Sequence, residues 1–109
     1  MTVSRSVAAL LTALAVAPAW GGPPVIEIEI RDHLFFPAEV EVPAHTKVKL
    51  LITNSDPSAE EFESYELNRE KIILGGRKAV IFIGPLEPGN YPFFGEFFPN
   101  TAQGVVIAR

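Results

Sequence analysis

The sequence predicts an all-β domain, a Greek-key β-sandwich of about seven strands, and three observations carry this prediction. Short segments alternate apolar and polar residues with a period of two, the pattern of a half-buried strand. Turn-forming residues separate these segments at short, regular intervals. Ten prolines leave no uninterrupted amphipathic stretch long enough for a helical bundle.

Residues 1–19 have the pattern of a secretory signal peptide. One basic residue, Arg5, precedes an apolar run from Val7 to Ala17, which is too short to cross a bilayer as a helix. Small residues at positions 17–19 suit signal-peptidase cleavage, so we expect cleavage near Ala19 and a periplasmic protein. An uncleaved membrane anchor is the alternative. Residues 20–109 then form the one domain that this length allows.

Three alternating strands are expected in the first half of this domain. The segment VIEIEIR at 25–31 puts isoleucines on one face and charged residues on the other. The segment EVEV at 39–42 alternates between two prolines. The segment KVKLLIT at 47–53 directs Val48, Leu50 and Ile52 inward, and the residues that follow it have turn composition.

The second half begins with a charged segment, EEFESYELNREK at 60–71, which suits one helical turn or a solvated strand. The segment KAVIFIG at 78–84 is apolar enough to predict a strand covered on both faces. A PLEPG turn at 85–89 then leads to two final strands, 90–94 and 104–108.

Composition excludes several classes of function. Because the chain has no cysteine, it has no disulfide scaffold, thiolate zinc site, thiol nucleophile or blue-copper thiolate. A net charge of −4 argues against a nucleic-acid partner. No Ser/His/Asp order, phosphate-binding loop or zinc-protease motif occurs, so we expect a protein that is not an enzyme.

Three blocks, residues 30–56, 60–71 and 84–108, carry a resemblance to a known family. They contain, in order, a strand ending in Asn, an acidic block, a PG-x-Y turn and a terminal loop. In this they resemble the cysteine-free cupredoxin-like domains of the EfeO type, named after an iron-uptake protein. The resemblance implies a cupredoxin-like sandwich that binds an iron or copper ion in periplasmic metal handling.

The alternative is a metal-free module that keeps the sandwich and docks a basic partner through its acidic face. Such a partner would be a membrane iron-permease assembly or another periplasmic protein.

The resemblance also shows where this chain departs from blue-copper cupredoxins. Counted from Tyr91, Gly95 stands at the usual Cys position and Phe98 at the usual His position. The upstream His is replaced by Glu60 or Glu61. All three strong ligands are therefore missing, and a type 1 copper site is not expected.

The acidic block supplies the first candidate ligands. In a strand that begins at residue 60, Glu61 and Glu63 point to one side and can clamp Fe(III), or Cu(II) with help from an imidazole. A slip of one residue would exchange Glu60 for Glu61 at this face. The alternative is a solvated charged edge in which basic residues balance acidic ones, namely Arg69 and Lys71 with Glu66 and Glu70.

Two further residues complete the predicted ligand set. Glu96 lies in the terminal loop, which should share one end of the sandwich with the acidic block, and the alternative for it is a surface position. His33 is the candidate imidazole ligand, or else a hydrogen-bonded structural residue. His45 is expected to be an exposed turn residue, and the phenylalanines of 93–98 are expected to pack in the core. The predicted metal ligands are thus Glu61, Glu63, Glu96 and His33.

Overall fold

The computed structural model describes residues 21–109, and every regular element in this range is a β-strand. The signal peptide expected over 1–19 lies outside the described residues. Within the described range no helix has the length and apolar character needed to span a membrane. The nine strands are β2 (Val25–Arg31), β3 (Leu34–Phe36), β4 (Glu39–Val42), β5 (Val48–Asn54), β6 (Glu60–Ser64), β7 (Arg69–Ile73), β8 (Lys78–Ile83), β9 (Gly89–Gly95) and β10 (Gln103–Ala108).

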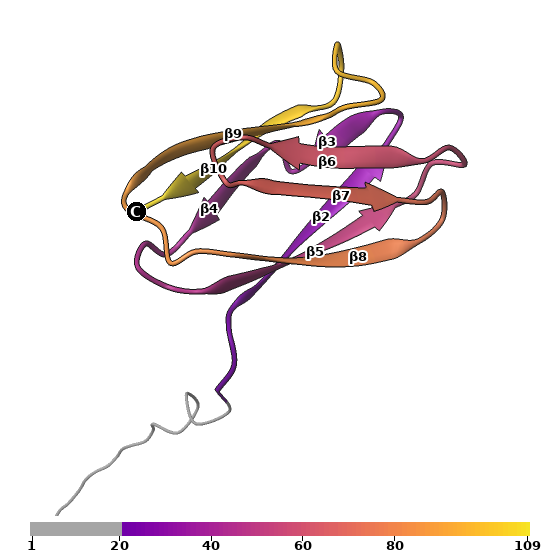
Figure 1. Ribbon diagram of the computed structural model, residues 1–109. Coiled ribbons are helices and arrows are strands. Elements are labelled where there is room, and N and C mark those ends of the chain that lie inside the picture. The colour runs from indigo at the N-terminus through magenta and orange to yellow at the C-terminus, as the bar shows by residue number, and fades with distance from the viewer. Residues whose placement is uncertain (1–20) are drawn as a thin grey trace, which may run out of the picture.

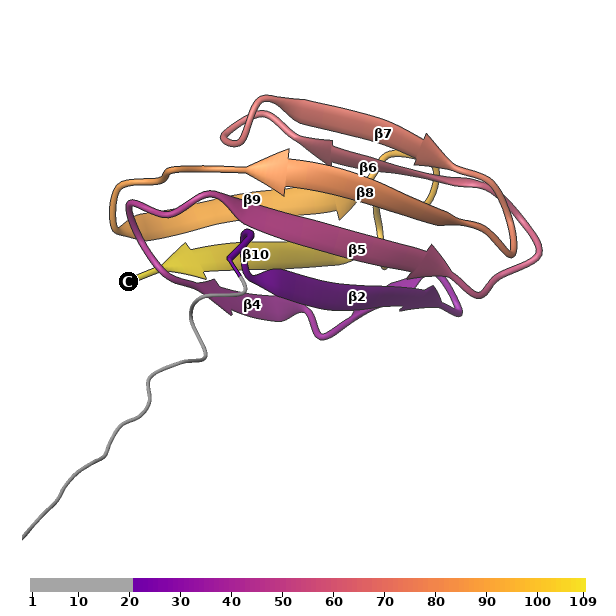
Figure 2. The same cartoon turned by 90° about the horizontal axis from the view of Figure 1, so that it is seen from below.

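The strands form two sheets that pack face to face (Figures 1 and 2). One sheet has the order β3-β2-β5-β8 and the other β4-β10-β9-β6-β7. Most neighbours are antiparallel, but β2 with β5 and β4 with β10 are parallel. This sandwich confirms the predicted fold class. The strand count exceeds the expected seven because β3 is a separate short strand and because 60–71 divides into β6 and β7.

The inner faces of the sheets follow the period-two pattern. Val48, Leu50 and Ile52 alternate along β5 and are at most 1% exposed, and Ile28 and Ile30 alternate along β2 and are at most 2% exposed. Burying one such side chain contributes about 1.5–3 kcal/mol. Because both strands turn an aliphatic row toward the opposite sheet, these rows provide much of the free energy that holds the layers together.

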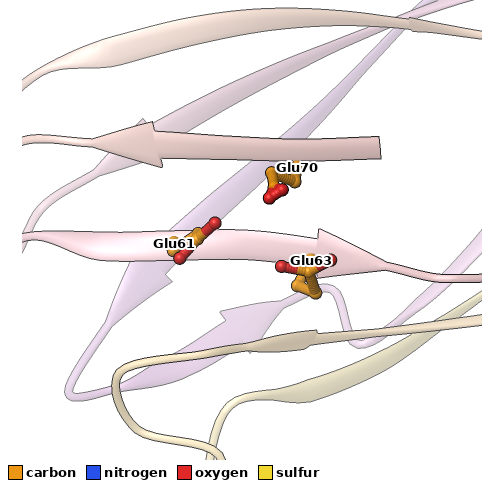
Figure 3. Close-up of side chains that lie close together, drawn as sticks. All are labelled: Glu61, Glu63 and Glu70. Carbon is orange, nitrogen blue, oxygen red and sulfur yellow. The ribbon is translucent and has the colours of Figure 1, made fainter. Parts of the chain in front are cut away.

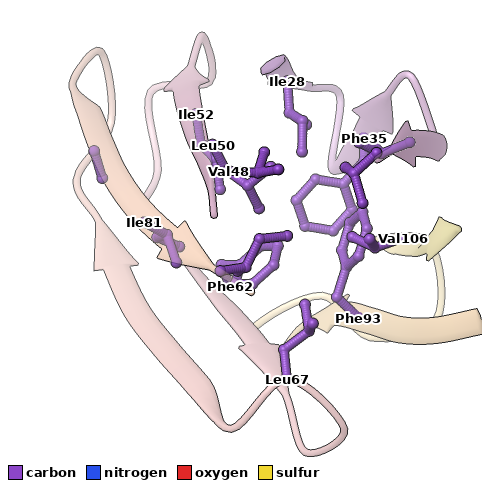
Figure 4. Close-up of a cluster of buried hydrophobic side chains, with 14 of the residues drawn as sticks. Ile28, Phe35, Val48, Leu50, Ile52, Phe62, Leu67, Ile81, Phe93 and Val106 are labelled. Atoms are coloured by element: carbon purple, nitrogen blue, oxygen red, sulfur yellow. The ribbon is translucent and has the colours of Figure 1, made fainter. Parts of the chain in front are cut away.

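Three phenylalanines fill the middle of the core (Figure 4). The rings of Phe62 on β6 and Phe93 on β9 stack with centroids 4.9 Å apart, and Phe35 on β3 meets Phe93 edge-on at 4.9 Å. Stacked and edge-on contacts are the favourable aromatic geometries. The expectation of core packing holds for Phe93 but is wrong for Phe97, whose side chain is 45% exposed.

Strand β8 differs from expectation because only one of its faces is covered. Ala79, Ile81 and Ile83 are buried, whereas Val80 is 40% and Phe82 is 42% exposed. Over the described residues the four-stranded sheet packs another sheet on its inner side only. Apolar composition therefore overstated the coverage of this strand.

The charged segment 60–71 forms neither a helical turn nor a single strand but most of a hairpin, β6 and β7. Ser64 shapes its turn, because the Ser64 hydroxyl accepts from the Leu67 amide at 3.0 Å and donates to the Pro92 carbonyl at 2.7 Å. Arg69 on β7 reaches the opposite sheet, where its Nε donates to the Phe82 carbonyl on β8 at 2.8 Å. The hairpin is thus fixed to both sheets.

Asn54 ends β5 with a fully buried amide that joins three segments. Its Nδ2 donates to the carbonyls of Ser58 and Ile73, both at 2.9 Å, and its Oδ1 accepts from the Asp56 amide at 3.0 Å. Buried polar groups need such partners. The Asp56 carboxylate is fixed by this network at the end of the sandwich that also holds the terminal loop and residue His33.

Candidate functional site

Three carboxylates gather on the outer face of the five-stranded sheet (Figure 3). Glu61 and Glu63 alternate with buried Phe62 on β6, so both point outward. Glu70 on β7 is paired with Glu63 across the antiparallel ladder, which places it on the same face. One oxygen from each of the three side chains lies within 4.8 Å of the other two. We call these three residues the carboxylate cluster.

The charges of the carboxylate cluster repel one another. Partial desolvation raises the pKa of Glu61, and repulsion from Glu70, Glu96 and Glu60 raises it further. The pKa of Glu63 is raised in the same way, first by desolvation and then by Glu70, Glu61 and Glu96. A raised carboxyl pKa means that holding both charges in this place is unfavourable. A bound cation would relieve that cost.

Basic side chains do not offset this charge within residues 21–109. The ion pairs there are Arg31–Glu29, His33–Asp56, His45–Glu87 and Arg109–Glu41, and none of them includes the carboxylate cluster. The guanidinium of Arg69 donates to main-chain carbonyls instead. Lys71 is opposite Phe62 in the ladder, on the other face of β7 from Glu70. The alternative interpretation, in which Arg69 and Lys71 balance Glu66 and Glu70, therefore has no ion pair to support it among residues 21–109.

Glu60 faces the interior, which resolves the alternative between Glu60 and Glu61. The Glu60 side chain is 1% exposed, and its Oε1 accepts from the main-chain amides of Glu61 and Phe97, each at 2.9 Å. Its Oε2 is buried and has no hydrogen-bond partner among the described residues. Glu60 is therefore a buried polar residue of the sandwich end, and Glu61 is the residue that reaches the outer face.

Glu96 is placed beside the carboxylate cluster without being part of it. Its side chain is exposed, and its main-chain amide donates to the Glu61 carbonyl at 2.8 Å. Its charge is near enough to raise the pKa of both Glu61 and Glu63. Glu96 thus adds negative potential to the outer face from the terminal loop.

His33 lies in a different constellation, at the end of the sandwich. The main-chain amides of Asp32 and His33 donate to the Asp56 carboxylate at 2.7 and 2.9 Å, and His33 Nδ1 is 3.4 Å from Asp56 Oδ2. The His33 ring stacks on Phe98 with centroids 3.6 Å apart and an angle of 12° between planes. His33 is not among the residues of the carboxylate cluster, and its contacts match the structural alternative for this residue.

The sequence reasoning missed Glu70 as a partner of Glu61 and Glu63. The signal was present, because a hairpin turn at residues 65–68 brings residue 70 opposite residue 63. Reading 60–71 as one strand or one helical turn hid this pairing. His45 has the exposed turn position expected of it, with a φ of 58°.

Comparisons with known proteins agree with this architecture. The family model described as "Cupredoxin-like domain" matches residues 5–108. The "Uncharacterized protein RP394" of Rickettsia prowazekii (strain Madrid E) is 49% identical over 84 residues, which span 77% of this chain and 67% of that protein.

Solved structures share the fold at low identity. Auracyanin A, a "blue" copper protein from Chloroflexus aurantiacus, has a TM-score of 0.70 at 13% identity, covering 81% of this chain and 100% of that one. The metal-binding domain of the Cu(I)-exporting P-type ATPase CopA of Streptococcus pneumoniae D39 has a TM-score of 0.69 at 18% identity, covering 78% and 84%. Likeness at this level of identity shows the fold alone.

Proposed function

Because this chain belongs to the cupredoxin-like domain family, we propose that it is an exported cation-binding protein of the EfeO type that takes part in periplasmic iron or copper handling. Binding alone, without catalysis, is the proposed activity. The observation that carries the proposal is the carboxylate cluster, whose charge no basic side chain of residues 21–109 offsets.

A type 1 copper centre does not fit the residues of this chain. Blue-copper sites need a cysteine thiolate, and the chain has none. At the equivalent end of the sandwich, a Cβ on Gly95 would lie 2.3 Å from Glu60 Oε2, so even an alanine side chain there would have to displace the Glu60 carboxylate. Phe98 is stacked on His33. The Glu60 carboxylate thus occupies the interior at this end of the sandwich, and the partly exposed His33–Phe98 pair lies at its surface.

The carboxylate cluster has the chemistry of a hard-cation site. Oxygen atoms are the ligands that hard cations prefer, whereas copper is favoured by imidazole and sulfur. Oxygens that bind a large ion such as Ca²⁺ at about 2.3–2.6 Å can lie up to about 5 Å apart, whereas bonds of about 2.0–2.1 Å to a smaller hard cation bring this limit to about 4 Å. The spacing of at most 4.8 Å among Glu61, Glu63 and Glu70 is within the first limit, and rotation of these outward-facing side chains on ion binding would bring the oxygens within the second. Because His33 is elsewhere, we propose Fe(III) as the preferred ion over Cu(II).

Calorimetric titration tests this proposal. The mature protein is titrated with Fe(III)-citrate and with Cu(II), beside the variants Glu63→Gln and Glu70→Gln and the matched control Glu39→Gln, which removes an exposed carboxylate on β4. We expect saturable iron binding that both cluster variants weaken at least tenfold and that the control leaves unchanged. Identical isotherms for all four proteins, or no binding by any of them, would refute the proposal.

Export is tested separately from binding. If residues 1–19 are a cleaved signal peptide, mass analysis of the periplasmic protein will find a chain that begins near Trp20. A chain that begins at Met1 or Thr2 would contradict this.

A metal-free interaction module is the second candidate, and two observations favour it. The His33 ring is stacked on Phe98, and the exposed ring of Tyr65 is 5.6 Å from Phe94 beside the acidic face. A basic partner, such as a membrane iron-permease assembly or another periplasmic protein, would dock on the acidic face next to Tyr65. Such docking should weaken steeply between low and physiological salt. Salt-insensitive capture of the partner would count against this candidate.

A further inference from the structure

Glu60 is a buried acidic residue whose second carboxylate oxygen is left without a donor. An unpaired buried oxygen is unfavourable, so a residue that keeps one calls for an explanation in its other contacts. Those contacts are concentrated on one atom, because Oε1 accepts both the Glu61 amide on β6 and the Phe97 amide of the terminal loop. Glu60 therefore connects two segments that are far apart in the sequence.

The connection lies where the main-chain ladder ends. β6 and β9 are paired only at Phe62 with Gly95 and at Glu63 with Phe94. Beyond Gly95 the loop is held to β6 by two bonds, from the Glu96 amide to the Glu61 carbonyl and from the Phe97 amide to Glu60 Oε1. After Gly95, where the pairing of β9 with β6 ends, the Glu60 side chain thus provides the acceptor that holds the chain to β6.

The Glu60 carboxylate has little freedom to leave this position. A Cβ built on Gly95 would lie 2.3 Å from Oε2 and 2.7 Å from the Cβ of Ala102, which shows how closely these three residues pack. Ala102 is fully buried. Only glycine at position 95 leaves room for the carboxylate, so side chain and loop fix each other.

We propose that Glu60 is a positioning residue whose Oε1 fixes the terminal loop, residues 96–102, against the start of β6 and so sets how far Glu96 lies from the carboxylate cluster. The loop carries Glu96 on its exposed side and Phe98 on the side that stacks with His33. The fixing of the loop is independent of any ligand. Its consequence for cation binding rests on the proposed function.

Two variants of the same length isolate the hydrogen bonds. Glu60→Gln and Glu60→Met both remove the charge and both fill the space, but only glutamine offers an oxygen to the two amides. Hydrogen exchange of the Phe97 and Glu96 amides is measured by NMR in the wild type and in both variants. We expect slow exchange in the wild type and in Glu60→Gln, and exchange at least about tenfold faster in Glu60→Met.

Equal exchange in the two variants would overturn the proposal. If Glu60→Met does not fold, the wild type still decides, because a Phe97 amide that exchanges as fast as an unstructured peptide contradicts a fixed loop.

A second measurement links the loop to binding. Glu96→Gln is introduced into both backgrounds, and the affinity for Fe(III)-citrate is measured by calorimetry. We expect Glu96→Gln to weaken Fe(III) binding several-fold in the Glu60→Gln protein. We expect it to have no effect in the Glu60→Met protein, where the terminal loop is no longer held by residue 60. The same loss in both backgrounds would overturn the positional role. If the wild type binds no cation, the proposed function fails, and hydrogen exchange alone decides the role of Glu60.

Discussion

Replacing Asn54 by alanine should remove a large part of the stability of the domain. Three hydrogen bonds are lost, two from Nδ2 to the carbonyls of Ser58 and Ile73 and one from the Asp56 amide to Oδ1. Each is worth about 0.5–1.5 kcal/mol net, and a buried acceptor left unpaired costs about 1–3 kcal/mol. Because Asn54 is fully buried, we expect Asn54→Ala to lower the free energy of unfolding by about 2–4 kcal/mol.

Urea denaturation followed by far-ultraviolet circular dichroism measures this loss. Asn90→Ala, an exposed position on β9, is the control and should cost under about 0.5 kcal/mol. Asn54→Asp separates donor from acceptor, because it keeps Oδ1 but turns a carboxylate oxygen toward two carbonyls. It should be at least as destabilising as alanine at neutral pH and recover at low pH, where a protonated acid donates again. A loss below about 1 kcal/mol for Asn54→Ala would refute the reasoning.

Three further predictions concern the acidic face and the sandwich edge. The pKa of Glu63 is raised from 4.5 in the folded state, so the folded chain binds this proton more tightly than the unfolded chain does. The free energy of unfolding should therefore fall as the pH rises through the raised pKa. Urea denaturation at several pH values should show that Glu63→Gln makes this fall smaller. Arg69→Lys should lower the free energy of unfolding by about 1 kcal/mol. The arginine guanidinium donates to the Phe82 carbonyl and to the Asn68 carbonyl at the same time, and a single lysine ammonium group does not replace both hydrogen bonds. Gly95→Ala should cost about 1–3 kcal/mol by overpacking against Glu60, measured in the same way.

Each of these predictions has a matched control or a contrary outcome. Glu39→Gln removes an exposed carboxylate away from the carboxylate cluster and should leave the pH profile unchanged. Arg31→Lys alters an exposed ion pair with Glu29, for which a cost near zero is expected. A Gly95→Ala protein as stable as the wild type would show that the sandwich end is looser than its packing indicates.

The sequence predicted strands and core correctly where aliphatic residues repeat on one face of a strand. The isoleucines of β2 and the Val48, Leu50 and Ile52 row of β5 predicted strands and core together, because the side-chain period of a strand is two. Sequence reasoning failed for β8, where an apolar run is compatible with one covered face or two, and only the sheet order decides between them.

The candidate site could be predicted only in part. Period two put Glu61 and Glu63 on one face, but which face met solvent depended on register, which a slip of one residue reverses. Glu70 needed the position of the hairpin turn. The partners of His33 could not be predicted because its backbone adopts a left-handed conformation, with a φ of 59°, that directs the residue toward Asp56 and Phe98. Non-local contacts of this kind leave no periodic signal in the sequence.

The bond from Arg69 to the Phe82 carbonyl has a consequence for the behaviour of the protein in concentrated solution. β8 pairs with β5 alone, so its other side offers main-chain groups to any extended polypeptide. The Arg69 guanidinium, from β7 in the opposite sheet, donates to one of those main-chain acceptors, the Phe82 carbonyl. Intermolecular strand pairing at this edge would have to displace a charged side chain first, which disfavours strand addition beside the exposed ring of Phe82.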